Sequence, residues 1–437
     1  MSQSWSPGVT GSWLPTVAFV RSSLLAIVLV TVALLGQRPD LLVLGAPFAI
    51  ITAWSAATRP RTPPELSDRL GNSTLREGDA TIWRGRVTDA DGTDLVSARM
   101  EPATWIDHRI DHGTVTMPVV DGRTDLDVVV RSTRWGRRLL SPVRLLATSS
   151  WGAYQCSMHT AHTSLTTLPL PAAFDTSAPR RPTDGLVGLE RSTRRGEGSE
   201  FAGVRAFGTG DRIRRINWAR SLRSDHLQVN ATWADQDTHV ALVIDAGADY
   251  GISEGIDGAA SSLDTAVRAA GAIAEHSGRR GDRISLRVFG AVGSHVVPAA
   301  AGPMQLRRVL DTLSRLQPGR GATAARRGGL PPWPANGAEL TVVLSPLISH
   351  EALDRAVSLG RHGLPVVVID TLPDTVLADD DPVAALAWRI RLLERRAEIR
   401  RVQQAGIPVV RWLGPGSLDQ FLRDVARRAS APRMRVG

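Results

Sequence analysis

The chain has 437 residues, of which 43% are hydrophobic, so it can hold about three domains and is too apolar for global disorder. Its 52 basic residues are all arginine, and the formal net charge of +9 would suit an anionic membrane surface or nucleic acid. The same balance would suit a solvated face beside a bilayer. The single cysteine, Cys156, excludes an intrachain disulfide.

Two apolar stretches follow an N-terminal tail of residues 1–13. Leu14–Leu35 is 22 residues long with one charge, and at about 1.5 Å per residue it can cross about 30 Å of hydrocarbon. Leu41–Ala57 comes after a short turn, so the two stretches together predict an antiparallel transmembrane hairpin over residues 14–57. No small-residue cleavage motif precedes Gln37, which disfavours the alternative of a signal peptide.

Three arginines indicate the orientation of this hairpin. Arg21 lies in the first third of the first stretch and can extend toward its N-terminal end. Arg59 and Arg61 follow the second stretch and lie at the same end of an antiparallel hairpin. By the positive-inside rule that end is cytoplasmic. We therefore expect a two-pass protein of the cell membrane whose soluble domains are cytoplasmic.

Residues 74–170, after a linker at 58–73, show the pattern of a small β-sandwich. Short alternating runs such as Ala80–Val87 are separated by turn signals such as Asp91-Gly92. The histidines of this region form two clusters about fifty residues apart, which makes a metal-dependent hydrolase here the least favoured hypothesis. A second linker, 171–195, is rich in proline.

Residues 196–235 carry an arginine-rich segment with interleaved apolar residues. The arginines are Arg212, Arg214, Arg215, Arg220 and Arg223, and the apolar residues are Ile213, Ile216, Trp218 and Leu222. Such a segment can hold phosphates or stack on bases. Its arginines can equally pack on the tryptophan and pair with nearby acids, which would fix a loop to its own domain. The charge pattern leaves both interpretations open.

This segment resembles the hallmark of the domain of unknown function 58 family. The usual pattern there is E-F, L-R-x-Y, P-G-D, R-x-I-D-W and a small residue. The matching residues here are Glu200, Phe201, Arg205, Phe207, Gly210, Asp211, Arg215, Asn217, Trp218 and Ser221. This chain departs from the pattern with Phe207 for Tyr, Thr209 for Pro and Asn217 for Asp.

The resemblance implies an order of parts and a function. In that family a membrane hairpin, a β-rich region, the signature and a von Willebrand factor A-like domain follow one another. Members are commonly partnered with MoxR-type AAA+ ATPases. The resemblance therefore implies a non-enzymatic, membrane-anchored adaptor that binds such an ATPase and other envelope proteins through the ten signature residues. The alternative is a membrane-surface protein that binds nucleic acid or another anionic polymer through the arginines.

The remaining half, 236–430 with a tail at 431–437, alternates strand and helix patterns. The predicted strands are 239–245, 284–289, 340–344, 364–369 and 408–412, and the predicted helices are 262–276, 303–316, 351–361, 382–404 and 417–428. Such alternation predicts an α/β doubly wound sheet. The whole chain is thus expected to be multidomain: a hairpin, a β-sandwich and an α/β domain.

Ligands of such a sheet gather at the carboxyl ends of its strands. In von Willebrand A domains this place holds a metal-ion-dependent adhesion site, and the residues that correspond here are Asp245, Asp249, Thr323 and Ser345. Gly247 stands where that motif has its first Ser. We expect a retained scaffold with a degenerate metal site. The alternative, in which Asp249 replaces a missing ligand and a divalent cation such as Mg²⁺ binds, stays open.

Known catalytic motifs are absent from the sequence. With no lysine there is no Walker A loop, and neither G-x-S-x-G nor H-E-x-x-H occurs. The sequence therefore proposes no catalytic residue, no enzymatic activity and no organic cofactor.

Overall fold

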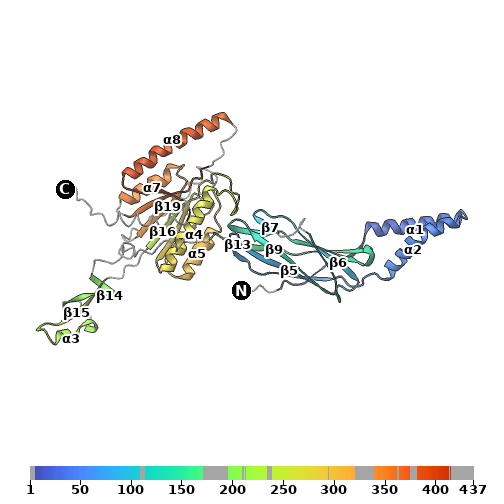
Figure 1. Cartoon of the computed structure of the whole chain (residues 1–437), viewed down its shortest axis with the longest axis horizontal. Helices are drawn as coiled ribbons and strands as arrows, with labels where there is room; N and C mark the ends of the chain where they lie inside the picture. Colours follow the sequence, from blue (N-terminus) through green and yellow to red (C-terminus); the bar gives the residue numbers. More distant parts are fainter. Residues whose placement is uncertain are drawn as a thin grey trace. The chain divides into compact units, whose positions relative to one another are not determined.

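The structure, a computed structural model, divides into two compact units that are described separately (Figure 1). It describes residues 5–108, 114–170, 195–208, 211, 213–233, 239–293, 295–319, 339–361, 364–374, 381–412 and 414. The first unit comprises Met1–Leu168 with Gly255–Asp257, and the second comprises the rest of the chain.

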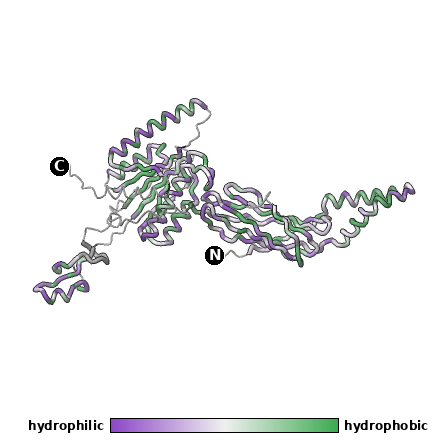
Figure 2. Tube along the Cα trace, in the orientation of Figure 1, coloured by the Kyte–Doolittle hydropathy of each residue, from purple (hydrophilic) through white to green (hydrophobic). Residues whose placement is uncertain are grey.

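The first unit contains the two predicted apolar helices, α1 (Val17–Leu35) and α2 (Pro39–Ala57), packed against each other. Both are long and apolar enough to cross a membrane by length and composition (Figure 2). The residues buried between them are small, namely Ala26, Ala33, Gly45 and Ser55. A Cβ on Gly45 would meet the Cβ of Leu29 at 3.1 Å, so small side chains allow the two backbones this close approach.

The segments on either side of the two helices, predicted as a tail (1–13) and a linker (58–73), contain β-strands. Strand β1 (Val9–Thr10) pairs with β3 (Glu65–Leu70), and β2 (Trp13–Pro15) pairs with β12 (Tyr154–His159). Strands of two or three residues are too short to show a period of two, so the sequence pattern could not reveal them. The β-rich unit therefore begins before the hairpin, and the hairpin is an insertion between two of its strands.

The β-rich region is a sandwich-like arrangement of strands that pair antiparallel, except for the parallel pair β13–β4. The other strands described are β4 (Thr74–Arg76), β5 (Ala80–Thr88), β6 (Thr93–Met100), β7 (Ile106–His108), β8 (Thr114–Pro118), β9 (Thr124–Ser132), β10 (Gly136–Leu140), β11 (Val143–Ser149) and β13 (Thr163–Leu168). Within the described residues they form sheets of order β1-β3-β5-β9-β7, β2-β12-β11-β6-β8 and β10-β13-β4. Alternate residues point inward and form one apolar core that includes Trp83, Leu126 and Leu145.

The second unit contains a mixed sheet with helices around it. Its strands are β16 (His239–Asp245), β17 (Arg283–Phe289), β18 (His295–Ala300), β19 (Glu339–Ser345), β20 (Val366–Asp370) and β21 (Val409–Arg411). Its long helices are α4 (Ser262–Arg280), α5 (Pro303–Leu313), α7 (His350–Arg361) and α8 (Pro382–Gln404). The bounds of α8 match the prediction, whereas the predicted helix 417–428 lies outside the described residues.

In the described part of this unit the strand order is β18-β17-β16-β19-β20-β21. All neighbours are parallel except β18, an antiparallel edge strand that the sequence pattern did not predict. Strand β16 lies between β17 and β19. The chain passes from β16 to its neighbour β17 and β18 on one side, and then crosses to its neighbour β19 on the other side. Right-handed crossovers then place the pair α4–α5 and the pair α7–α8 on opposite faces (Figure 1). The carboxyl ends of β16, β19 and β20 therefore meet at one edge.

A two-stranded ribbon precedes this sheet in the chain. Strand β14 (Arg195–Ala206) pairs antiparallel with β15 (Gln228–Trp233), and the loop between them holds a 3-10 turn (Ile213–Arg215) and the short helix α3 (Trp218–Ser221). This ribbon, called the signature hairpin below, contains all ten signature residues.

Candidate functional site

The signature hairpin is held in shape by an ion pair that its sequence pattern encodes. The Arg205 guanidinium donates two bonds to the Asp211 carboxylate, of 2.7 Å and 2.5 Å, and the backbone N–H of Gly208 donates to the same carboxylate at 2.8 Å. The arginine beside it holds the pKa of Asp211 below its usual value. Phe207 closes the loop through its backbone N–H, which donates to the carbonyl of Leu227 at 2.8 Å. Arg205 and Asp211 are therefore loop-shaping residues.

A second set of bonds fixes helix α3. The Asn217 side-chain oxygen accepts from the backbone N–H of Arg220 at 3.1 Å, and its amide nitrogen donates to Asn230 at 2.9 Å. The Ser221 hydroxyl donates to the Asn217 carbonyl at 2.8 Å and accepts from the Gln228 N–H at 2.9 Å. Asn217 thus caps a helix and ties it to β15, and its amide supplies a donor that the family's usual Asp lacks.

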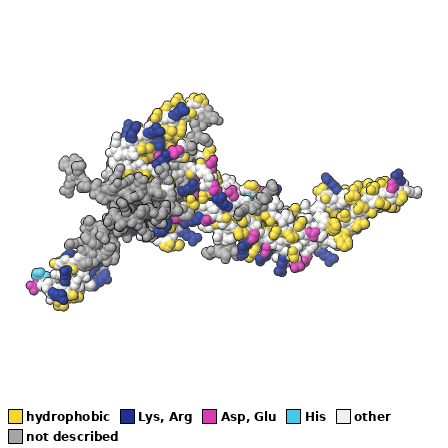
Figure 3. Space-filling model, viewed as in Figure 1, with side chains coloured by type: hydrophobic (Ala, Val, Ile, Leu, Met, Phe, Trp, Pro, Cys, Tyr) yellow, Lys and Arg dark blue, Asp and Glu magenta, His cyan; other side chains and the backbone are white. Residues whose placement is uncertain are grey.

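These bonds support an exposed apolar and basic tip. Ile213, Trp218 and Leu222 are 71%, 57% and 85% exposed, although each is large and apolar. Arg214, Arg220 and Arg223 are exposed beside them, and Figure 3 shows apolar and basic side chains together at this end of the hairpin. We call these six residues the tip surface. Among them only Trp218 belongs to the ten signature residues, and the three arginines were predicted to bind under the alternative function. Ile213 and Leu222 resemble ordinary core residues in the sequence.

The remaining signature residues differ in what the structure says of them. Glu200 and Phe201 lie in β14, but their side chains are outside the described part of the chain, and Gly210 is outside it altogether. Arg215 is half-buried at the end of the 3-10 turn. Ile216, beside it, is buried and bridges to Val229 of β15, which anchors the loop.

The carboxyl edge of the sheet is the second candidate site. Asp245 at the end of β16 is buried, and its two oxygens accept from the Ser345 hydroxyl at 2.7 Å and from the Gly247 N–H at 3.1 Å. Burial raises the pKa of Asp245 above its usual value. The predicted pairing of Asp245 with Ser345 at one place is therefore present. Thr323 lies outside the described residues.

Asp249, which the alternative hypothesis makes a metal ligand, accepts hydrogen bonds at the start of α4. Its carboxylate accepts from the Ser261 hydroxyl at 2.9 Å, the Ser262 hydroxyl at 3.2 Å and the Leu263 backbone N–H at 2.9 Å. These groups surround the N-terminus of α4, where unpaired N–H groups and the helix dipole favour an anion. Of the residues the structure describes, no three His, Cys, Asp or Glu side chains come together as metal ligands would.

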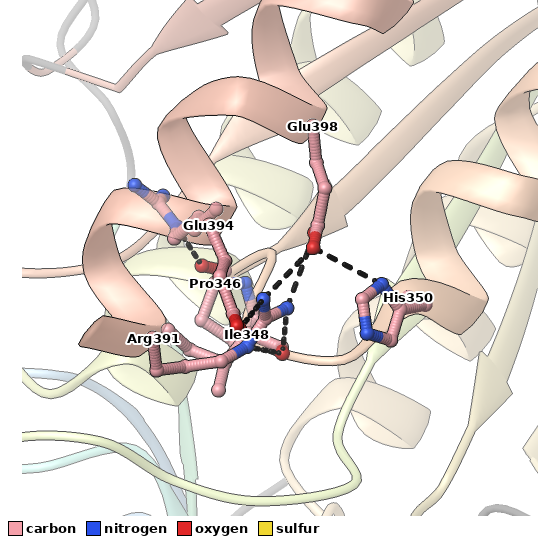
Figure 4. Close-up of polar contacts among 7 residues, drawn as sticks. Pro346, Ile348, His350, Arg391, Glu394 and Glu398 are labelled. Atoms are coloured by element: carbon pink, nitrogen blue, oxygen red, sulfur yellow. Dashed lines mark hydrogen bonds and ion pairs between the residues drawn. The ribbon is translucent and has the colours of Figure 1, made fainter. Parts of the chain in front are cut away.

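Arginines from α8 reach the same edge of the sheet (Figure 4). Arg391 donates to the Ile348 carbonyl at 2.9 Å and to Glu398 at 2.9 Å, and Glu398 also lies 3.2 Å from His350. The pKa of Glu398 is lowered by its bond to Arg391. Arg395 donates to the Pro346 carbonyl at 3.0 Å and forms an ion pair with Asp370 at the end of β20.

These contacts direct three charged residues of α8 toward the body of the unit. Its charged residues Arg391, Arg395 and Glu398 turn toward the loop after β19, so they are buried or half-buried. Its outward face instead carries Val383, Leu386, Ile390 and Leu393, which are 50–72% exposed. These four apolar residues lie beside exposed charged residues of the same helix, such as Arg389 and Arg396. Sequence reasoning placed this helix but could not tell which face is inward.

These features define a class: a multidomain protein with an N-terminal pair of apolar helices, a β-sandwich and an α/β unit that follows a signature hairpin. Residues 203–380 match the model of the family described as "Protein of unknown function DUF58". This match confirms the resemblance to that family that the residues of the signature hairpin predicted.

Similar proteins extend the match beyond these residues. An uncharacterized protein of Mycobacterium bovis and two uncharacterized proteins from strains of Mycobacterium tuberculosis are each 29% identical over 250 residues, which cover 54% of this chain and 69% of theirs. Two solved structures each overlap 23% of the chain: a non-cellulosomal cohesin of Archaeoglobus fulgidus and the cupredoxin domain of amoB from Nitrosocaldus yellowstonii. The matches cover 88% and 82% of those chains at 10% and 9% identity. Their TM-scores of 0.18 and 0.16 are too low to indicate a shared fold.

Proposed function

We propose that this protein is a membrane-anchored, non-enzymatic adaptor that binds a MoxR-type AAA+ ATPase during the assembly or activation of envelope-associated complexes. The observation that carries this proposal is the tip surface, where Ile213, Trp218 and Leu222 are exposed on a loop that internal bonds hold rigid. Large apolar side chains held in this way are the usual anchors of protein interfaces. Their tryptophan and arginine content is typical of interface hot spots.

The α/β unit supports the proposal as a von Willebrand A-like scaffold. Its strand order with the antiparallel edge strand β18, and Asp245 at the end of the first strand, are the features in favour. We propose that the metal site is degenerate, because Asp249 caps α4 and Arg395 neutralises Asp370. The outward face of α8 is then a second contact surface for the partner.

The N-terminal hairpin supports membrane anchoring, and its charges support a cytoplasmic location for both units. Arg21 in α1 and Arg59 and Arg61 beyond α2 lie at the end where the hairpin joins the β-sandwich. At the opposite end Arg38 and Asp40 form an ion pair of 3.0 Å and add no net charge. The excess positive charge is thus all on the sandwich side.

Co-purification tests the adaptor hypothesis. The full chain in detergent is mixed with a MoxR-type ATPase of the same organism, and the Trp218→Ala/Leu222→Ala variant is compared with wild type. Both side chains are exposed, so the fold should be kept, and the dissociation constant should rise at least about thirtyfold. Leu139→Ala, which truncates an apolar residue 66% exposed on the sandwich, is the matched control. Unchanged binding by the tip variant would refute the assignment.

The ion pair beneath the tip gives an independent test. Arg205→Ala and Asp211→Ala should each weaken ATPase binding, because either one removes the bond that shapes the loop. The exchange Arg205→Asp/Asp211→Arg should restore part of the binding if the pair acts only through loop shape. If both single variants bind like wild type, this loop is not the interface.

The alternative function, binding of nucleic acid or another anionic polymer, draws on Arg214, Arg220 and Arg223 of the tip surface. It predicts a steep decrease of affinity with salt, since each phosphate contact releases a counterion. The apolar half of the tip surface favours the protein partner. Polymer binding with a steep salt slope, together with indifference to the ATPase, would reverse that preference.

A further inference from the structure

A hollow of about 650 Å³ lies at the foot of the α1–α2 hairpin, where both helices meet the β-sandwich. Trp13 of β2, on the strand that leads into α1, forms one wall. The other lining residues come from the segment before β2 and from the end of α2 and the segment beyond it: Gly11, Ser12, Ala56, Ala57, Arg59, Pro60, Arg61 and Pro63. The hollow therefore lies at the level where a membrane-spanning hairpin would leave the hydrocarbon.

The walls of this hollow are fixed by contacts of their own. Trp13 is 9% exposed, and its indole N–H donates to the carbonyl of Thr62 at 2.9 Å, which ties the strand before α1 to the segment after α2. The Arg59 guanidinium lies 5.3 Å from the centre of the Tyr154 ring. This contact fixes the direction of one cation without neutralising it.

The two arginines carry charge that the described residues do not balance. Arg59 and Arg61 are both exposed, and in the described part of the chain neither forms an ion pair with a carboxylate. Arginine presents a planar fork of donors that matches the oxygens of a phosphate group. Trp13, although it belongs to the core of the sandwich, lines the hollow beside these two arginines.

We propose that this hollow binds the phosphate-bearing headgroup of an anionic phospholipid. The guanidinium groups of Arg59 and Arg61 hold the phosphate, and Trp13, Ala57 and Pro63 contact the apolar part below it. The inference rests on the membrane anchoring proposed above. Under this proposal the foot of the α1–α2 hairpin selects anionic lipids, whereas the length and hydropathy of the helices do not distinguish one lipid headgroup from another.

Native mass spectrometry of the full chain in detergent tests this site. Phosphatidylglycerol and phosphatidylcholine with identical acyl chains are added, and bound lipids are counted. Wild type should prefer phosphatidylglycerol by about tenfold, and Arg59→Gln/Arg61→Gln should reduce the ratio to near one. Arg99→Gln/Arg123→Gln, which removes two exposed charges elsewhere on the sandwich, should leave the preference unchanged.

Two further experiments distinguish a lipid phosphate from a soluble one, and failure of this proposal from failure of the proposed membrane anchoring. Glycerol 3-phosphate should not displace the lipid; equal binding of this soluble compound would overturn the lipid assignment. Alkaline carbonate extraction of cells first tests anchoring, and release of wild type into the supernatant would overturn both proposals. Retention in the membrane with no preference between the two lipids would overturn only the present one.

Discussion

Substitution of Asp249 tests whether its carboxylate caps helix α4 or binds a cation at the carboxyl ends of the strands. Asp249→Ala removes three hydrogen bonds at the start of α4 and leaves the Leu263 N–H without this acceptor. Ser261 still forms a capping box with Asp264, so the helix keeps part of its cap. Losing a charged cap with one orphaned backbone donor costs about 2 kcal/mol.

The expected loss is measurable by calorimetry of the full chain in detergent. The two compact units should give separate transitions, of which only one should shift. For a unit of about 270 residues, 2 kcal/mol corresponds to about 4 °C in Tm. The shift should be the same with Mg²⁺ and with EDTA, because a cap does not depend on a cation.

A matched control and a refuting result complete this test. Asp311→Ala on α5 removes a half-exposed acid that forms a surface ion pair with Arg315, and it should change the free energy of unfolding by less than about 0.5 kcal/mol. The reasoning is wrong if Mg²⁺ raises the wild-type Tm by several degrees and Asp249→Ala abolishes that increase. Asp249 would then be a cation ligand, as the alternative sequence hypothesis stated.

Three further predictions concern polar interactions inside the two units. Burial raises the pKa of Asp245, so its contribution to stability is complete below pH about 3.9 and is lost as pH rises through the folded-state pKa. Urea unfolding at a series of pH values above about 4 should show Asp245→Asn gaining stability relative to wild type as pH rises. A difference that does not change with pH would contradict this. Arg391 lowers the pKa of Glu398, so the pH dependence of stability has the opposite sign. Glu398→Gln should be less stable than wild type at pH 7. This difference in stability should shrink as pH falls below about 4.5 and through the folded-state pKa. Trp83→Phe removes the 2.9 Å bond from the buried indole to Asp68 and should cost about 1–3 kcal/mol, seen as a lower Tm of the sandwich transition alone.

The long elements could be predicted because their patterns are local. An apolar run such as Val240–Ile244 has little choice but a buried strand, and α8 begins at Pro382 after the capping Asp381. The helices of the hairpin follow from composition alone. The short strands β1 and β2 depend instead on partners more than fifty residues away, which no local pattern reveals.

The candidate site was predicted less completely, because the roles of its residues depend on tertiary contacts. Arg205 and Asp211 were recognised as signature residues, but only the structure shows that they bind each other beneath the exposed tip. Asp249 has the spacing of a ligand, yet α4 folds back so that its N-terminus takes this carboxylate. Arg391 and Arg395 lie in an ordinary arginine-rich helix, and their inward direction is set by the loop after β19.

The arginines of α8 bear on what the carboxyl edge can do. In a cation site the strand-end carboxylates would be neutralised by the metal, whereas here Arg395 pairs with Asp370 and a hydroxyl bonds the buried Asp245. These interactions supply part of the compensation that buried charge requires. The same contacts turn Arg391 and Arg395 inward, while Leu386 and Leu393 are exposed on α8. These exposed apolar residues, together with the tip surface of the signature hairpin, are the basis on which we propose a protein-binding role.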